Sequence, residues 1–84
     1  MKTGDPQLGL TDLVDALRAG RVGRISNSNP AGLLWERTYR WTAEGGFQVL
    51  LEGPGQYNDW FTFDTGEQCF DSWKRGAAEF FWSI

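Results

Sequence analysis

Residues 33–52 constrain the fold more strongly than any other part of the chain. Within them the aromatic residues fall in one set of alternate positions, Trp35, Arg37, Tyr39 and Trp41, and the other set is polar or charged: Glu36, Thr38, Arg40 and Thr42. A period of two is typical of a β-strand that presents one face to a core. Phe47 to Glu52 follows after a short Gly-containing segment. We therefore expect two neighbouring strands with an aromatic face.

The connection between these strands fixes how they pair. It reads Ala43-Glu44-Gly45-Gly46, and a three-residue loop with Gly45 in the left-handed conformation is a common hairpin connection. Such a loop sets Trp41 opposite Phe47 and Tyr39 opposite Val49, which brings the apolar side chains to one face. A two-residue loop would scatter them over both faces. The apolar pattern therefore predicts the longer loop.

Two shorter segments are also expected to be extended. Trp60 to Asp64 follows a connecting loop at 53–59 that contains Gly and Pro, and we expect Phe61 and Phe63 to point inward. Val22 to Ile25 lies between turn residues. We expect it to form a short strand at the edge of the sheet.

A short helix is predicted near the N-terminus. Thr11 is a suitable N-cap for a helix over residues 12–19, and Gly20 is a suitable residue to end it. The apolar side chains of this segment fall on one helical face. They are Leu10, Leu13, Val14 and Leu17.

A second helix is predicted from Thr65, because Thr65 and Gln68 have the spacing of a capping box. An apolar stripe runs along it to the end of the chain. The stripe consists of Phe70, Trp73, Ala77, Phe80, Phe81 and Ile84. Gly76 interrupts this helix at a cost of about 1 kcal/mol relative to Ala, which suggests a kink. Trp82 falls on the polar side of the same helix.

The expected architecture is α+β. A short N-terminal helix is followed by a three-stranded antiparallel sheet, made of the hairpin and the strand at 60–64, and a C-terminal amphipathic helix packs on one face. The 84 residues are enough for one domain over 1–84, with residues 1–9 expected to be disordered. The start of the chain has no apolar leader segment, and no apolar run is long enough for a membrane span. A single cysteine, Cys69, agrees with a reducing compartment, so we expect a cytoplasmic protein.

The residue inventory argues against an enzyme. The chain has no His, which removes the commonest general base and metal ligand. Cys69 has acidic neighbours at Glu67 and Asp71, and these disfavour the reactive thiolate. The acids do not follow the pattern of a calcium-binding loop. We expect no catalysis, no cofactor and no metal.

Charge is sorted along the chain, and this bears on partners. Between positions 43 and 71 there are six acidic residues and no Lys or Arg, whereas positions 18–40 hold five Arg and one acid. Exposed Trp and Tyr are frequent binding hot spots. We therefore expect an acidic, aromatic surface that binds a basic protein, such as one that itself binds nucleic acid. The candidate residues are Glu52, Tyr57, Asp59, Trp60, Asp64 and Glu67.

This profile is that of a small non-enzymatic inhibitor or adaptor. Phage anti-defence proteins such as anti-CRISPRs, and toxin-immunity proteins, include acidic proteins of this size. The alternative is a nucleic-acid-binding module that uses the basic residues Arg18, Arg21, Arg24 and Arg40. An isoelectric point near 4.7 and the acid-rich half of the chain disfavour direct contact with phosphates.

Overall fold

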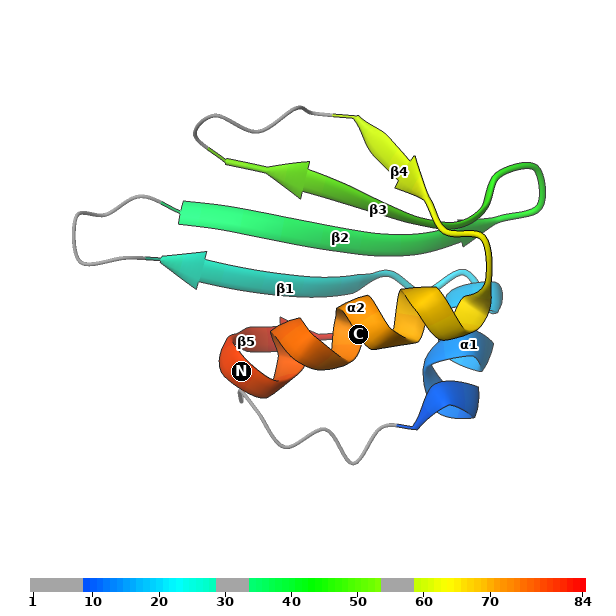
Figure 1. The fold of residues 1–84 in the computed structure, drawn as a ribbon, viewed down its shortest axis with the longest axis horizontal. Coiled ribbons are helices and arrows are strands. Elements are labelled where there is room, and N and C mark those ends of the chain that lie inside the picture. The colour runs from blue at the N-terminus through cyan, green and yellow to red at the C-terminus, as the bar shows by residue number, and fades with distance from the viewer. Residues whose placement is uncertain (1–8, 29–33, 54–58) are drawn as a thin grey trace.

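The computed structural model describes residues 9–28, 34–53 and 59–84 (Figure 1). Its elements are, in chain order, α1 (Leu10–Arg18), β1 (Gly23–Ser28), β2 (Leu34–Thr42), β3 (Gly46–Glu52), β4 (Trp60–Thr62), α2 (Gly66–Glu79) and β5 (Phe81–Ser83). The strands form one antiparallel sheet in the order β4-β3-β2-β1-β5. The α+β class is confirmed, but the sheet has five strands where the sequence predicted three. In the part of the chain that is described, no helix is both long and apolar enough to cross a membrane.

The central hairpin has the predicted register. Trp41 pairs with Phe47, and Tyr39 pairs with Val49. The loop between the strands has the predicted three residues, since Thr42 pairs with Gly46. The left-handed residue is Gly46, with a φ of 72°, and not Gly45 as expected. Gly45 instead donates its N–H to the Thr42 hydroxyl at 2.8 Å. This hydrogen bond closes the turn just before Gly46.

The segment expected to form an edge strand lies inside the sheet. β1 pairs with β2 on one side and with β5 on the other. It also extends to Ser28 through polar residues that the sequence indicated as turn. Pairing with β2 along the whole strand, and with β5 as far as Ser26, overrides the low strand propensity of these residues. Ile25, at the middle of β1, is fully buried.

The end of the chain differs most from expectation. α2 ends at Glu79, Phe80 is extended with φ −127° and ψ 174°, and residues 81–83 form β5. Trp82 therefore lies in a strand and not on the polar side of a helix. It pairs with Ile25, and its ring meets the Trp73 ring edge to face, with centroids 5.8 Å apart. The apolar stripe continued past the end of the helix because β5 faces the same core.

Helix caps follow the expected chemistry at one helix and differ at the other. Thr65 caps α2, accepting a hydrogen bond from the Gln68 N–H at 3.2 Å. α1 begins at Leu10, so its N-cap is Gly9 and not Thr11. The Asp12 carboxylate accepts the Gly9 N–H at 3.3 Å, and this contact makes the earlier start favourable. The expected disorder of residues 1–9 lies, apart from Gly9, outside the described residues.

Gly76 does not break α2, which runs from Gly66 to Glu79. A Cβ at this position would lie 2.7 Å from the Ile25 Cδ1 atom, so only glycine lets the helix approach β1 this closely. The glycine therefore serves packing between helix and sheet.

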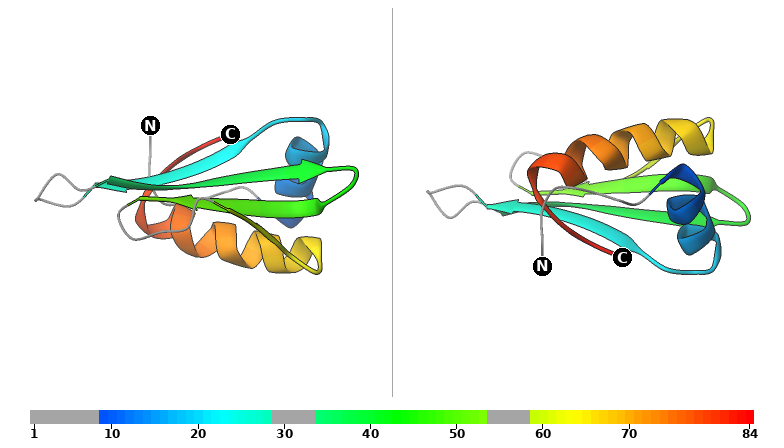
Figure 2. Two further views of the ribbon diagram at one scale, coloured as in Figure 1. Left: turned by 90° about the horizontal axis from the view of Figure 1, so that it is seen from above. Right: turned by 90° about the horizontal axis from the view of Figure 1, so that it is seen from below.

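The core lies on one face of the sheet, which we call the core face. The buried strand residues lie on this face: Gly23, Ile25, Tyr39 and Val49. Directly paired residues share a face, and Tyr39 pairs with both Gly23 and Val49, while Ile25 is two positions from Gly23 along β1. α2 lies along this face only (Figure 2). The helices complete the buried cluster with Leu13 and Leu17 of α1 and Cys69, Trp73 and Ala77 of α2. The opposite face, which we call the open face, holds none of the buried residues among those described.

Candidate functional site

The outer edge of the sheet carries the most exposed large apolar side chain described. β4 is the last strand of the sheet and pairs only with β3. Its two aromatic residues point to opposite faces: Phe61 pairs with Val49 on the core face, and Trp60 pairs with Leu50 on the open face. Phe61 is 60% exposed, so the expectation that it points into the core is wrong. It shares the core face but lies beyond the buried cluster, and only Phe63 packs there.

Trp60 is held on the open face by residues of the neighbouring strands. The Arg40 guanidinium lies over the indole ring, 3.5 Å from its centroid. Arg40 Nε donates to Gln48 Oε1 at 2.9 Å, and Gln48 Nε2 donates to Thr62 Oγ1 at 3.2 Å. This row of contacts crosses three strands and fixes the orientation of the Arg40–Trp60 pair. A cation over a Trp face is the most favourable form of cation–π contact.

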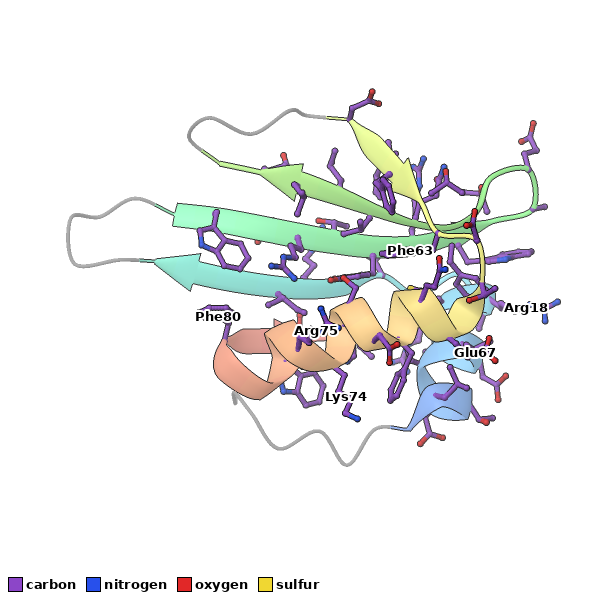
Figure 3. All side chains as sticks on the ribbon, viewed as in Figure 1. Arg18, Phe63, Glu67, Lys74, Arg75 and Phe80 are labelled. Carbon is purple, nitrogen blue, oxygen red and sulfur yellow. The ribbon has the colours of Figure 1, made fainter. Side chains whose placement is uncertain are left out.

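The predicted acidic residues divide into two groups. Glu52 at the end of β3, Asp59 before β4 and Asp64 after it are exposed and flank the outer edge of the sheet. Glu67 is apart from them: it lies in the first turn of α2 and lines a cavity against α1 together with Arg18 and Trp41 (Figure 3). The prediction for Tyr57 lies outside the described residues.

A further acid adds to the first group. Glu36 on β2 pairs with Glu52 on β3, and like charges directly opposite each other in a sheet are unfavourable. The pair makes this end of the open face strongly acidic. We name the outer-edge surface by its residues: Glu52, Asp59, Trp60, Phe61 and Asp64.

The four arginines of the alternative prediction do not form one basic patch. Arg24 and Arg40 are on the open face, where Arg24 pairs with Thr38 and Arg40 is the next residue along β2 on that face. Arg18 lies instead over the Trp41 ring, 5.3 Å from its centroid, on the side of the helices. Arg21 lines a separate cavity beside Trp82. Since they are divided in this way, they do not provide the continuous row of charges that tracks a phosphate backbone.

Comparison with known proteins finds no matching family, no similar curated protein and no similar solved structure. Among the described residues, no three His, Cys, Asp or Glu side chains come together as metal ligands.

Sequence reasoning missed two features that bear on function. Phe61 was assigned to the core because it alternates with Trp60 beside Phe63. Arg37 shares the aromatic face of β2 and is the one charged residue in the alternation of Trp35, Tyr39 and Trp41. A charge within an apolar stripe was the signal available. Arg37 lines a cleft on the core side of the sheet.

Cys69 is buried and its thiol is unreactive. Burial raises the pKa of its thiol from 9.0 to about 12, so the reactive thiolate does not form near neutral pH. The cause is burial, not the acidic neighbours in the sequence.

This pKa predicts a loss of stability at alkaline pH. Above pH 9 the unfolded thiol loses its proton while the folded one keeps it, so the unfolded state becomes favoured as pH rises. Between pH 8 and pH 10 this contributes a loss of about 1.4 kcal/mol in the free energy of unfolding. Urea denaturation at both pH values measures it. Between pH 8 and pH 10 the free energy of unfolding of the Cys69→Ala variant should fall by about 1.4 kcal/mol less than that of the parent. An equal fall in both proteins would contradict the raised pKa of Cys69.

Proposed function

We propose that this protein is a small non-enzymatic inhibitor or adaptor that uses its outer-edge surface to bind a basic protein. The observation that carries the proposal is Phe61, which is 60% exposed on the edge strand between the exposed acids Asp59 and Asp64. An exposed aromatic residue within a field of one charge is typical of a docking site for a protein of opposite charge.

The negative charge around Trp60 and Phe61 supports a basic partner. No Lys or Arg occurs in the sequence from Ala43 to Asp71, the segment that supplies β3, β4 and the start of α2. Arg40 is the nearest cation on the open face, and its guanidinium is engaged by Trp60 and Gln48. The acids therefore dominate the field that an approaching protein meets at this edge.

The two kinds of residue should serve different steps of binding. Long-range attraction by the acids accelerates encounter, since complementary charge acts mainly on the association rate. Aromatic side chains that lose their water in the complex slow dissociation. Phe61 offers area that is already exposed, and Trp60 offers an indole whose position is fixed by Arg40.

Identification of the partner is the first experiment, by affinity capture from the native host. Surface plasmon resonance with the purified partner then separates the two roles. Reversal of Asp59 and Asp64 to Lys should slow association and weaken its dependence on salt. The matched control is Asp15→Lys, which reverses an exposed acid on α1 and should leave association close to that of the parent.

Truncation of the aromatic residues should act on dissociation. Phe61→Ala and Trp60→Ala should each accelerate it and weaken affinity by about 2 kcal/mol or more. Val22→Ala is the control, because Val22 is 40% exposed but precedes β1 and is not part of the outer-edge surface. Circular dichroism must show that each variant is folded. Unchanged kinetics in folded Phe61 and Trp60 variants would contradict the proposal.

A further inference from the structure

Arg37 occupies a position where a sheet rarely places a charge. The strand residues of the core face are otherwise uncharged, and Arg37 lies at the middle of β2 between Trp35 and Tyr39 on that face. It is half-buried. Because removing a charge from water is costly, an arginine retained on such a face calls for a reason beyond packing.

Aromatic contacts hold the Arg37 guanidinium in place. It lies over the Trp35 ring, 5.1 Å from the centroid, and the Trp35 ring meets the Phe80 ring edge to face at 5.1 Å. The guanidinium also lies against α2 at Gly76, where a Cβ would make an ordinary van der Waals contact with Nη1 of Arg37 at 3.6 Å. Stacking uses the face of a guanidinium and leaves the N–H groups in its plane free to donate.

A cleft opens between this arginine and α2. It has a volume of about 420 Å³, which falls within the range of small-molecule sites. Its lining residues are Arg37, Gln68, Asp71, Ser72, Arg75, Gly76 and Phe80. The two arginines outweigh the one acid, so the cleft is cationic.

The helix wall of the cleft provides a second guanidinium. Arg75 is exposed and projects from the side of α2 on which Phe80 lies just past the end of the helix, while Lys74 projects from the other side (Figure 3). The Ser72 hydroxyl is paired with the Tyr39 hydroxyl at 2.7 Å. This bond ties the middle of α2 to β2 and fixes the spacing between the walls.

We propose that this cleft binds a small molecule that carries an oxyanion, either a carboxylate or a phosphate, beside an aromatic ring. Arg37 and Arg75 would donate to the oxyanion, since a guanidinium matches the geometry of both groups. The ring would lie against Phe80, the aromatic residue that lines the cleft. The site is separate from the outer-edge surface and does not depend on the partner proposed above.

Titration of the isotope-labelled protein with phenyl phosphate and with benzoate tests the proposal by NMR. At least one of these probes should saturate with a Kd on the order of 1 mM or tighter, with amide shifts centred on residues 37 and 72–76. Benzyl alcohol, which has the ring without the charge, should bind at least tenfold more weakly. The preferred probe identifies the oxyanion as phosphate or carboxylate.

Substitutions in the cleft complete the test. Arg37→Gln and Arg75→Gln should each weaken binding of the preferred probe about tenfold or more, whereas Lys74→Gln should leave it within twofold. If Arg37→Gln does not fold, Arg75→Gln decides, because Arg75 is exposed and outside the core. The proposal is overturned if neither probe saturates below about 20 mM, well beyond the affinity expected of such a site, or if Arg75→Gln binds as the parent does.

Discussion

Truncation of Trp73 to Ala is expected to lower the free energy of unfolding by about 3–5 kcal/mol. Trp73 is fully buried and is the largest side chain of the core. Its ring meets Tyr39 edge to face at 5.4 Å and Trp82 at 5.8 Å, so its removal leaves a cavity bordered by a helix and two strands. A domain of this size has a total stability on the order of 5–10 kcal/mol, so the variant should lose a large part of it.

Urea denaturation followed by circular dichroism measures this loss. Phe61→Ala serves as the control, because it also removes an aromatic ring but one that is 60% exposed. It should cost far less than the Trp73 substitution, since surface substitutions have small effects. A Trp73→Ala protein that unfolds at the same urea concentration as the parent would contradict the packing of α2 on the sheet.

The hairpin was predictable because local signals agreed. The alternation in β2, the loop residues and the apolar pattern of β3 all point to the same register, and Trp41 pairs with Phe47 as a result. Each of these signals acts over a few residues. A sequence pattern can therefore identify such a pair without knowledge of the rest of the chain.

The position of β1 and the existence of β5 were not predictable in the same way. β1 becomes an interior strand only because residues more than 50 positions away in the sequence pair with it, as Ile25 does with Trp82. The C-terminal end of α2 could not be predicted from the sequence for a related reason. Phe80, Trp82 and Ile84 pack on the same core as the helix, so apolar residues continue at spacings that a helical period also accommodates.

The candidate site shows how folding rearranges charge. Acidic and basic residues are separated along the chain, but antiparallel pairing brings Arg40 of the basic part onto Trp60 of the acidic part, 3.5 Å from its ring centroid. Residue counts identified the acids around β4. They could not identify which aromatic side chain of β4 the core leaves exposed, because this depends on how far α2 reaches across the sheet.

Trp82→Ala provides the sharpest test of the chain end. If residue 82 were on the polar side of a helix, its truncation would change stability by no more than about 0.5 kcal/mol. In β5 the same side chain packs against Trp73 and pairs with the buried Ile25 of β1. We expect a loss of about 2–4 kcal/mol, somewhat below that of a fully buried Trp, measured by urea denaturation.

A double-mutant cycle assigns that loss to the contact between the two indoles. Loss of stability in the Trp73→Ala, Trp82→Ala double variant should fall short of the sum of the single losses by at least about 0.5 kcal/mol, because the two side chains share one contact. Trp82→Phe is the matched control. It keeps a ring against Trp73 and removes the Nε1–H of Trp82, which is buried without an acceptor among the described residues. Since an unpaired buried donor is itself destabilising, Trp82→Phe should lower the free energy of unfolding clearly less than Trp82→Ala does. If the losses of the two single variants instead add up to the loss of the double variant, Trp82 does not pack against Trp73 in the core.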